Sequence, residues 1–442
     1  MTDHDGRRRG PSEDHDIRLA RLREAVRTGL WFVPTLFAVG AIVLSVVMNR
    51  LDEAFGTGRG GFSFGGGPEA AQEVLSTISS STLAFTGVVF SITIIALQLA
   101  SSQFSPRVLR TFLRDRGSQV ALGIFVATFV YSLLVLRTVR LDDAGAEPFA
   151  PGLSITVAIA LVLLSLGAFV YYVNHIAQSI RVVSIIDSVA GATRRAIDEN
   201  YPADDEPPEL PDYALPAGPP LAVLHCERQA GVLLGVDEDD LVATARRHGC
   251  VLRLIPRVGD FVASGAPLFE VFGTAGITVG EVLPHVGLGA ERTMYQDVAF
   301  GFRQLVDIAE KALSPSTNDP TTAVQAVDRL HDLLRRMAAR PWPSGLHTDA
   351  DGSLRLVHQV ASWADHLSLA FDEIRGYGAG SLQVARRLRA VFDDLATVVD
   401  DQASRDALDR QRRLLDAALA RQFPDAEERQ SATVADDQGL GG

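Results

Sequence analysis

The sequence predicts an α-helical membrane protein with four transmembrane helices, joined to a cytoplasmic α+β region in which a small β-barrel or sandwich-like module precedes a helical domain. Two observations lead to this prediction. Four apolar stretches lie within about the first 175 residues, and each is near the ~20 residues that a helix needs to cross a bilayer. Farther along the chain, short apolar runs punctuated by glycine are followed by long segments of helical periodicity.

The four spans are predicted at about residues 30–48, 83–99, 120–136 and 153–173, within a transmembrane domain at 30–175. None of them contains Lys, Arg, Asp or Glu, which argues against a proton-coupled pump, because such pumps use ionisable groups inside the membrane. The first span is too long for a cleaved signal peptide and lacks a small-residue cleavage site, so we expect it to remain in the mature chain.

Arginines concentrate on one side of the predicted membrane. They fill the N-terminal segment at 1–29, the loop between spans two and three, and the region after span four. Arg107, Arg110 and Arg114 form the basic loop between spans two and three. The positive-inside rule therefore predicts a multi-pass membrane protein with both termini in the cytoplasm.

The remaining residues divide into segments that differ in composition and hydrophobic pattern. We expect a helical extension and a proline-rich linker at 176–220, a small β module at 221–289, a helical domain at 290–423 and a disordered tail at 424–442. Within the helical domain, one helix is predicted at about 353–375 and carries His358 and His366 roughly on one face.

Charge and cysteine content exclude some functions. The net charge of -13 argues against a nucleic-acid partner, because phosphate binding needs a basic surface. Cys226 follows His225 and Cys250 lies near His248, a combination that can bind zinc. Adjacent strand residues face opposite sides, however, so buried thiols beside exposed histidines are favoured. His358 and His366 lack a third ligand, and we predict no metal or cofactor.

Span two is rich in hydroxyl side chains. Its polar residues include Ser79, Thr82, Thr86, Thr93 and Gln98. Small hydroxyl residues allow close packing of helices in lipid, and this is the favoured interpretation. The alternative is that span two lines a polar path through an oligomer.

A second polar group surrounds a predicted corner between two helices. Asn318 and Asp319 suit turn and N-cap positions before Pro320, and four further polar residues lie upstream. These are Asp297, Arg303, Gln304 and Asp307. They form either a polar ligand pocket or, as we favour, a capped helical hairpin with surface ion pairs.

Three strings together resemble one bacterial family. They are SSSTLAFTGVVFSIT at 79–93 with QFSPR at 103–107, QDVAFGFRQLVDIA at 296–309, and NDPTTA at 318–323. The resemblance covers about residues 20–420 and is to predicted inner-membrane proteins catalogued as domain of unknown function 2254. One departure is Ser316-Thr317, where a glycine and an aliphatic residue are expected. The resemblance implies the membrane topology and supplies no catalytic residue.

No catalytic motif is present in the sequence, so enzymatic activity is not expected. The favoured function is an oligomeric channel-like or transport protein, with span two lining a polar path and with the lipid bilayer and other copies of the chain as partners. The alternative is a membrane-anchored cytoplasmic sensor or scaffold that binds a ligand or a protein.

Overall fold

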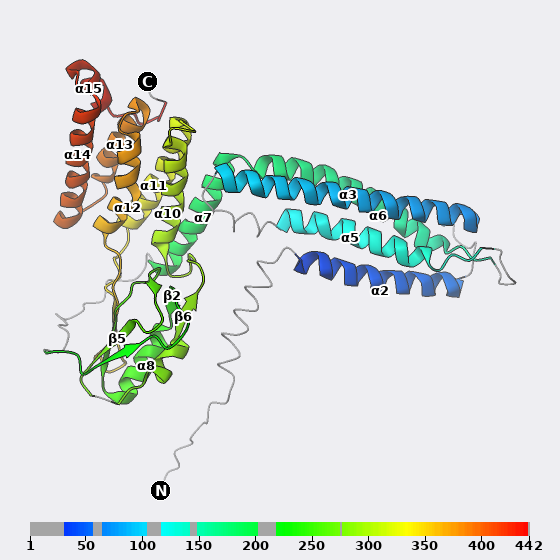
Figure 1. Cartoon of the computed structure of the whole chain (residues 1–442), viewed down its shortest axis with the longest axis horizontal. Coiled ribbons are helices and arrows are strands. Elements are labelled where there is room, and N and C mark those ends of the chain that lie inside the picture. The colour runs from blue at the N-terminus through cyan, green and yellow to red at the C-terminus, as the bar shows by residue number, and fades with distance from the viewer. Residues whose placement is uncertain are drawn as a thin grey trace, which may run out of the picture. The chain divides into compact units, whose positions relative to one another are not determined.

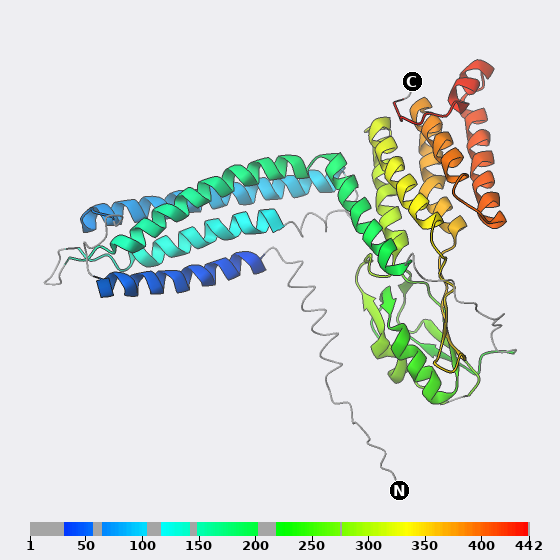
Figure 2. The same cartoon turned by 180° about the vertical axis from the view of Figure 1, so that it is seen from behind.

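The computed structural model describes residues 31–55, 64–103, 116–141, 148–201, 218–274 and 276–440. Arg107, Arg110 and Arg114 lie outside these ranges. The chain divides into two compact units, Met1–Ser184 and Ile185–Gly442. Figures 1 and 2 show both units from opposite sides, and each is described here by itself.

The first unit consists of long apolar helices. They are α2 (Phe32–Phe55), α3 (Pro68–Gln103), α5 (Arg116–Leu136) and α6 (Gly152–Ser179). All four are long and apolar enough to cross a membrane, so the four predicted spans are confirmed as helices. The α5 helix packs against the other three and is the most buried of them (Figure 1).

The α3 helix starts well before the predicted span at residue 83. Pro68 suits the first turn of a helix, where its missing N–H is not needed. Hydroxyl groups along the next turns bond back to the helix itself; the Ser80 hydroxyl donates to the carbonyl of Ser76 at 2.9 Å. The serine-rich segment can therefore continue the helix although it is not hydrophobic.

Large apolar side chains project outward from the helices of this unit. They include Leu36, Val43, Leu83, Phe90, Ile95, Leu163 and Val170, each at least 56% exposed. Such a surface is costly in water and suits contact with lipid chains.

A carboxylate from one helix caps the start of another. Pro151, the N-cap residue of α6, has no side-chain capping bond. Asp52 of α2 caps this helix instead. Its carboxylate accepts hydrogen bonds from the backbone N–H groups of Leu153 (2.8 Å) and Ser154 (2.9 Å) and from the Ser154 hydroxyl (2.6 Å). Asp52 is only 7% exposed. The end of α2 is thereby joined to the beginning of α6.

The second unit contains two sheets and a set of helices. The β part comprises β1 (Ala222–His225), β2 (Gly231–Val236), α8 (Glu238–His248), β3 (Val251–Leu254), β4 (Phe261–Val262), β5 (Pro267–Phe272), α9 (Val279–Val282), η2 (Leu283–His285), β6 (Val286–Gly289), β7 (Leu346–Thr348) and β8 (Leu354–Val357). One sheet has the order β1-β5-β3-β8-β7 and the other β4-β2-β6. Residues of both sheets and of α8 share one hydrophobic core.

The β part is not one continuous segment of the chain. The strands β7 and β8 come from beyond residue 340, and β8 pairs in parallel with β3 through Leu252 and Leu356. The expected helix over 353–375 is therefore wrong over residues 353–362. Leu354 and Leu356 lie on the strand β8, where every second side chain is buried. The helix that follows, α12, begins only at Trp363, and Ser362 is its N-cap residue.

Helices make up the rest of the second unit. They are α7 (Val182–Asn200), α10 (Val298–Leu313), α11 (Pro320–Ala338), α12 (Trp363–Gly378), α13 (Leu382–Leu395), α14 (Gln402–Gln422) and α15 (Ala426–Thr433). The first three residues of α7 precede Ile185, where this unit begins. The segment after residue 424 was expected to be disordered; instead it forms α15, which Asp425 caps through the N–H groups of Glu427 and Glu428.

The α7 helix is held against α10 and α11. Gly301 of α10 lets α7 approach, because a Cβ placed there would lie 2.1 Å from the Thr193 hydroxyl oxygen. Ion pairs join Asp187 to Arg329 and Asp198 to Arg336 along the α7–α11 contact. These exposed pairs are each worth little, up to ~1 kcal/mol, so close packing holds α7 in place.

Candidate functional site

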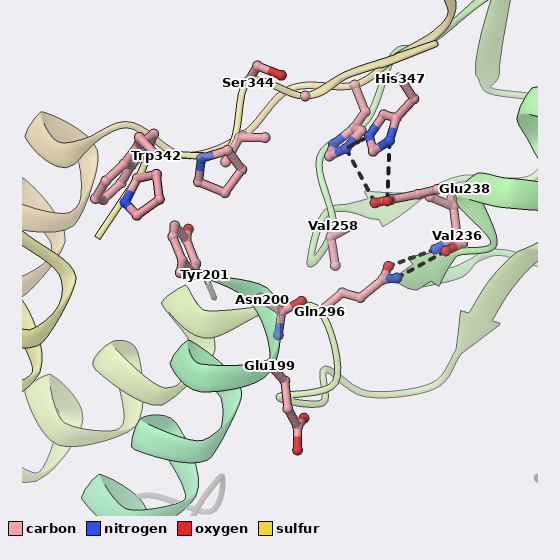
Figure 3. A pocket seen from close by; sticks show the side chains of 15 residues that line it. Glu199, Asn200, Tyr201, Val236, Glu238, Val258, Gln296, Trp342, Ser344 and His347 are labelled. Carbon is pink, nitrogen blue, oxygen red and sulfur yellow. Dashed lines mark hydrogen bonds and ion pairs between the residues drawn. The ribbon is translucent and has the colours of Figure 1, made fainter. Parts of the chain in front are cut away.

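The second unit contains a cleft of about 480 Å³ (Figure 3). Its walls come from the end of α7, from β2 and the start of α8, and from the segments on either side of the β7–β8 hairpin. The lining residues include Glu199, Asn200, Tyr201, Glu238, Val258, Gln296, Trp342, Ser344, His347 and His358. Segments from residues 199 to 360 of the chain therefore meet at this one place.

Aromatic rings form one wall of the cleft. Tyr201 and Trp342 meet edge to face, with ring centroids 5.3 Å apart. The Trp342 indole N–H donates to the carbonyl of Ala361 at 3.1 Å, which fixes the ring. Behind it lie Trp363 and His366, both buried. Burial raises the pKa of Tyr201, so its phenol is neutral and remains a hydrogen-bond donor.

Gln296 fixes the connection between the β part and α10. Its amide oxygen accepts from the N–H of Val236 at 2.9 Å, and its amide nitrogen donates to the carbonyl of the same residue at 3.0 Å (Figure 3). A side chain at Gly235 would collide with this amide, since its Cβ would lie 2.4 Å from the Gln296 oxygen. These contacts therefore hold Gln296 and the end of β2 in fixed positions beside the cleft.

Glu238, His347 and His358 converge at the opposite end of the cleft. The two histidine Nε2 atoms are 2.9 Å apart, and a nitrogen of each ring lies 3.4 Å from an oxygen of Glu238. Burial and the neighbouring His358 lower the pKa of His347, which keeps its ring neutral near pH 7. Burial alone would raise the pKa of Glu238, but the hydrogen bond with His358 and the nearby rings lower it, so this carboxylate is ionised.

A second hollow, of about 320 Å³, adjoins the first and shares Tyr201, Gln296 and His358 with it. Asp297 lies in its wall and is 5% exposed. It caps α10 and forms an ion pair of 2.7 Å with Arg292. Burial outweighs the effect of Arg292 and raises the pKa of Asp297. Gly259, at φ +93°, lies directly against this ion pair, and a Cβ at this position would collide with it.

The other predicted polar residues do not join Asp297. Arg303 and Asp307 form an ion pair of 2.5 Å on α10, extended by Glu310 and Glu373. Gln304 is buried in the same helix. These contacts resemble the capped hairpin with ion pairs more than a ligand pocket.

Asn318 and Asp319 lie at the far end of α10 from Asp297. A helix of 16 residues spans ~24 Å, which separates this corner from the cleft. Asn318 adopts φ +46°, and Asp319 accepts from the N–H of Thr322 ahead of Pro320, so the predicted turn and N-cap are confirmed. The corner stops one helix and starts the next.

The hydroxyl residues of span two divide between the inside and the outside of the first unit. Ser79 and Thr82 are buried, and the Thr93 hydroxyl is 2.6 Å from that of Tyr172 on α6. The Thr86 hydroxyl donates to the carbonyl of Thr82. Gln98 is exposed. Contacts within one chain therefore account for the Thr86 and Thr93 hydroxyl groups, as helix packing predicts, whereas the buried Ser79 hydroxyl has no hydrogen-bond partner among the described residues.

Among the described residues, neither cysteine belongs to a group that could hold a metal ion. Cys226 and Cys250 are free and fully buried, while His225 is exposed, as the strand geometry predicts. His248 bonds instead to Glu281 at 2.9 Å. His358 and His366 lie on different elements, because His358 follows β8 and His366 belongs to α12. Sequence reasoning missed His347 and Glu238, since only the pairing of β7, β8 and β3 brings them beside His358.

Comparison with known proteins identifies a matching family of predicted membrane proteins and relatives from mycobacteria. Residues 27–394 match the family described as predicted membrane protein (DUF2254). The chain is 35% identical over 427 residues to proteins named "Uncharacterized protein" from Mycobacterium tuberculosis strain H37Rv and from Mycobacterium bovis, an alignment that covers 93% of this chain and 80% of each relative. No solved structure matches this chain.

Proposed function

The chain belongs to the DUF2254 family of predicted membrane proteins, and from this premise we propose that it is a membrane-anchored binding protein. Its four apolar helices hold it in the bilayer, and its second unit binds a small polar molecule in the cleft. The distribution of arginines supports a place for the second unit in the cytoplasm, and the mycobacterial relatives support a bacterial membrane.

The cleft is the observation that carries this proposal. Its volume of about 480 Å³ lies within the usual range of small-molecule sites, and its aromatic wall and convergent polar groups are typical of them. Glu199 and Glu238 line it, and no Lys or Arg is among its lining residues. The ligand is therefore a neutral or cationic polar molecule.

The α7 helix supports a sensing role for the cleft. It begins at Val182, soon after α6 ends at Ser179, and its last residues, Glu199 and Asn200, line the cleft. Arg340 donates to the carbonyl of Ile197 at 3.2 Å and also to that of Tyr201, which fixes the helix end beside the aromatic wall. A ligand that moves Tyr201 would therefore move α7 with it.

A cleft-filling substitution tests the binding role. We expect at least one neutral or cationic probe, from a set of amino acids, polyamines and nucleosides, to raise the unfolding temperature of the purified full-length protein in detergent. A ligand at 100 times its Kd stabilises by about 2.7 kcal/mol. Val258→Trp, which fills the cleft, should abolish the shift, whereas Val434→Trp, at an exposed position outside it, should not. Absence of any shift, or a shift that persists in Val258→Trp, would contradict the proposal.

An oligomeric channel is the second candidate, and one face of α3 supports it. Ser80, Ala84, Gly87, Ser91 and Gln98 all lie at least partly on the surface of this unit, and a Cβ at Gly87 would meet nothing within 4 Å. Such a face suits either close contact between copies of the chain or a polar path among them.

Leucine substitutions separate these two uses of the α3 face. If it lines a path, Ser91→Leu and Gln98→Leu should abolish ion flux in liposomes while the oligomeric mass is kept. If the face packs between copies, the same changes should reduce the mass. Ile95→Leu, at an exposed apolar position of the same helix, is the control. A wild-type protein that is monomeric and conducts no ions would argue against both uses.

A further inference from the structure

Two histidines and a glutamate gather at one end of the cleft. His347 lies on β7, His358 directly follows β8, and Glu238 is the first residue of α8. One potential ligand atom from each lies within 4.8 Å of the others. In the part of the chain that the structure describes, no other three His, Cys, Asp or Glu residues come together in this way.

The separations fit the ligand shell of a small metal ion. Ligands at tetrahedral positions 2.0–2.1 Å from zinc are about 3.3 Å apart. Here the Nε2 atoms of His347 and His358 are 2.9 Å apart. The Nε2 atom of His358 and the Nδ1 atom of His347 each lie 3.4 Å from an oxygen of Glu238. His347 can offer only one of its two nitrogens to an ion, so a rotation of its ring is needed to place one atom from each side chain, already within 4.8 Å of one another, on one face of a tetrahedron.

The backbone around these side chains is fixed. The strands β7 and β8 pair in antiparallel register, with Leu346 opposite Val357, and the N–H of His358 donates to the carbonyl of Gly345 at 2.9 Å. Gly345, at φ +68°, permits this approach, since a Cβ there would lie 2.2 Å from the His358 carbonyl oxygen. Asp237 caps α8 and sets the position of Glu238. Such support from rigid elements is what a metal site requires.

We infer that Glu238, His347 and His358 bind a zinc-class divalent ion, whose fourth coordination position opens into the cleft. Two imidazoles and one carboxylate are a donor set that zinc accepts, whereas calcium and magnesium need more oxygen ligands than this site offers. The three side chains are partly exposed, at 36%, 27% and 15% for Glu238, His347 and His358, so an ion can enter and an outside ligand can reach it. The inference deepens the proposed binding role and rests on it, because the ion would hold a donor atom of the bound molecule.

Zinc titration of the full-length protein tests the inference. Protein purified in detergent and stripped with a chelator is titrated with zinc in competition with a metal-sensitive dye. We expect one zinc ion per chain and a rise in unfolding temperature on binding. His358→Ala and Glu238→Gln should each weaken binding by about 100-fold or more. His225→Ala, which removes an exposed histidine of the same β part, should leave binding unchanged.

The same samples show whether a variant has merely unfolded. In the presence of chelator, the metal-free wild type and the two site variants should unfold at similar temperatures, and only the zinc-dependent rise should be lost. Zinc binding that is absent in the wild type, or equal in wild type and His358→Ala, would overturn the inference.

The metal site and the binding role can fail separately. If zinc does not bind but a polar probe still stabilises the wild type and not Val258→Trp, the metal inference is wrong and the proposed function stands. If zinc binds at Glu238, His347 and His358 but no probe stabilises the protein with or without it, the site exists and the proposed function is wrong.

Discussion

Replacing Asp52 by alanine is expected to destabilise the four-helix unit by about 2–4 kcal/mol, the combined size of a lost N-cap and newly unpaired buried donors. The carboxylate accepts from two backbone N–H groups and one hydroxyl at the start of α6. No acidic residue lies in the first turn of α6, so no other side chain there replaces this charge. Its loss would leave the N–H groups of Leu153 and Ser154 without a partner in a region shielded from water.

The neighbouring residue provides a matched control for Asp52. Glu53 carries the same charge on the same helix but is exposed, so Glu53→Ala should change stability by less than ~0.5 kcal/mol. The measurement is unfolding of the purified protein in mixed micelles with increasing SDS, followed by the loss of helical circular dichroism. Equal midpoints for the two variants would show that the contact with α6 contributes no stability.

Gly301→Val is expected to destabilise the second unit by about 3 kcal/mol or more. A Cβ at this position would lie 2.1 Å from the hydroxyl oxygen and 2.8 Å from the Cβ of Thr193, which is completely buried on α7. The two helices must therefore move apart, and overpacking of this kind typically costs about 1–3 kcal/mol before the additional methyl groups of valine are placed. Because α7 ends at the cleft, the same change should weaken binding of any cleft ligand.

A second glycine in a helix serves as the control. It separates the clash between α10 and α7 from the general effect of replacing a helical glycine by valine. Gly376 lies on α12 and is exposed, and a Cβ placed there would meet nothing within 4 Å, so Gly376→Val should be close to neutral or slightly stabilising. Thermal unfolding of both variants, followed by tryptophan fluorescence, gives the comparison. A Gly301→Val protein that melts with the wild type would contradict the close approach of α7 and α10.

The elements that the sequence predicted well are those encoded locally. The four spans depend on about twenty consecutive apolar residues each, and no distant contact is needed to recognise them. The N-cap at Asp319 and the following Pro320 are likewise a signal of neighbouring residues. The start of α3 was missed because it is too polar to be read as a membrane span and is held by the packing of Ala71 and Leu75 in the core of the first unit, which hydropathy does not register.

The elements that the sequence did not predict depend on distant partners. The β8 strand has only four residues, so the alternation of its inward Leu354 and Leu356 is too short to be recognised beside the longer helical pattern that follows it. The group of Glu238, His347 and His358 has no local signature, since more than a hundred residues separate the first from the other two. The pairing of Asp52 with α6 is invisible for the same reason.

The parallel pairing of β3 with β8 has a consequence for synthesis on the ribosome. The partner of β3 is made about 100 residues later, which corresponds to roughly 5–20 s at typical elongation rates of ~5–20 residues per second. During that time the β3 edge of the sheet exposes unpaired backbone groups that can pair with other chains. The nascent second unit therefore passes through an aggregation-prone stage while the four apolar helices already require insertion, and we expect its production to depend on chaperones that shield this edge.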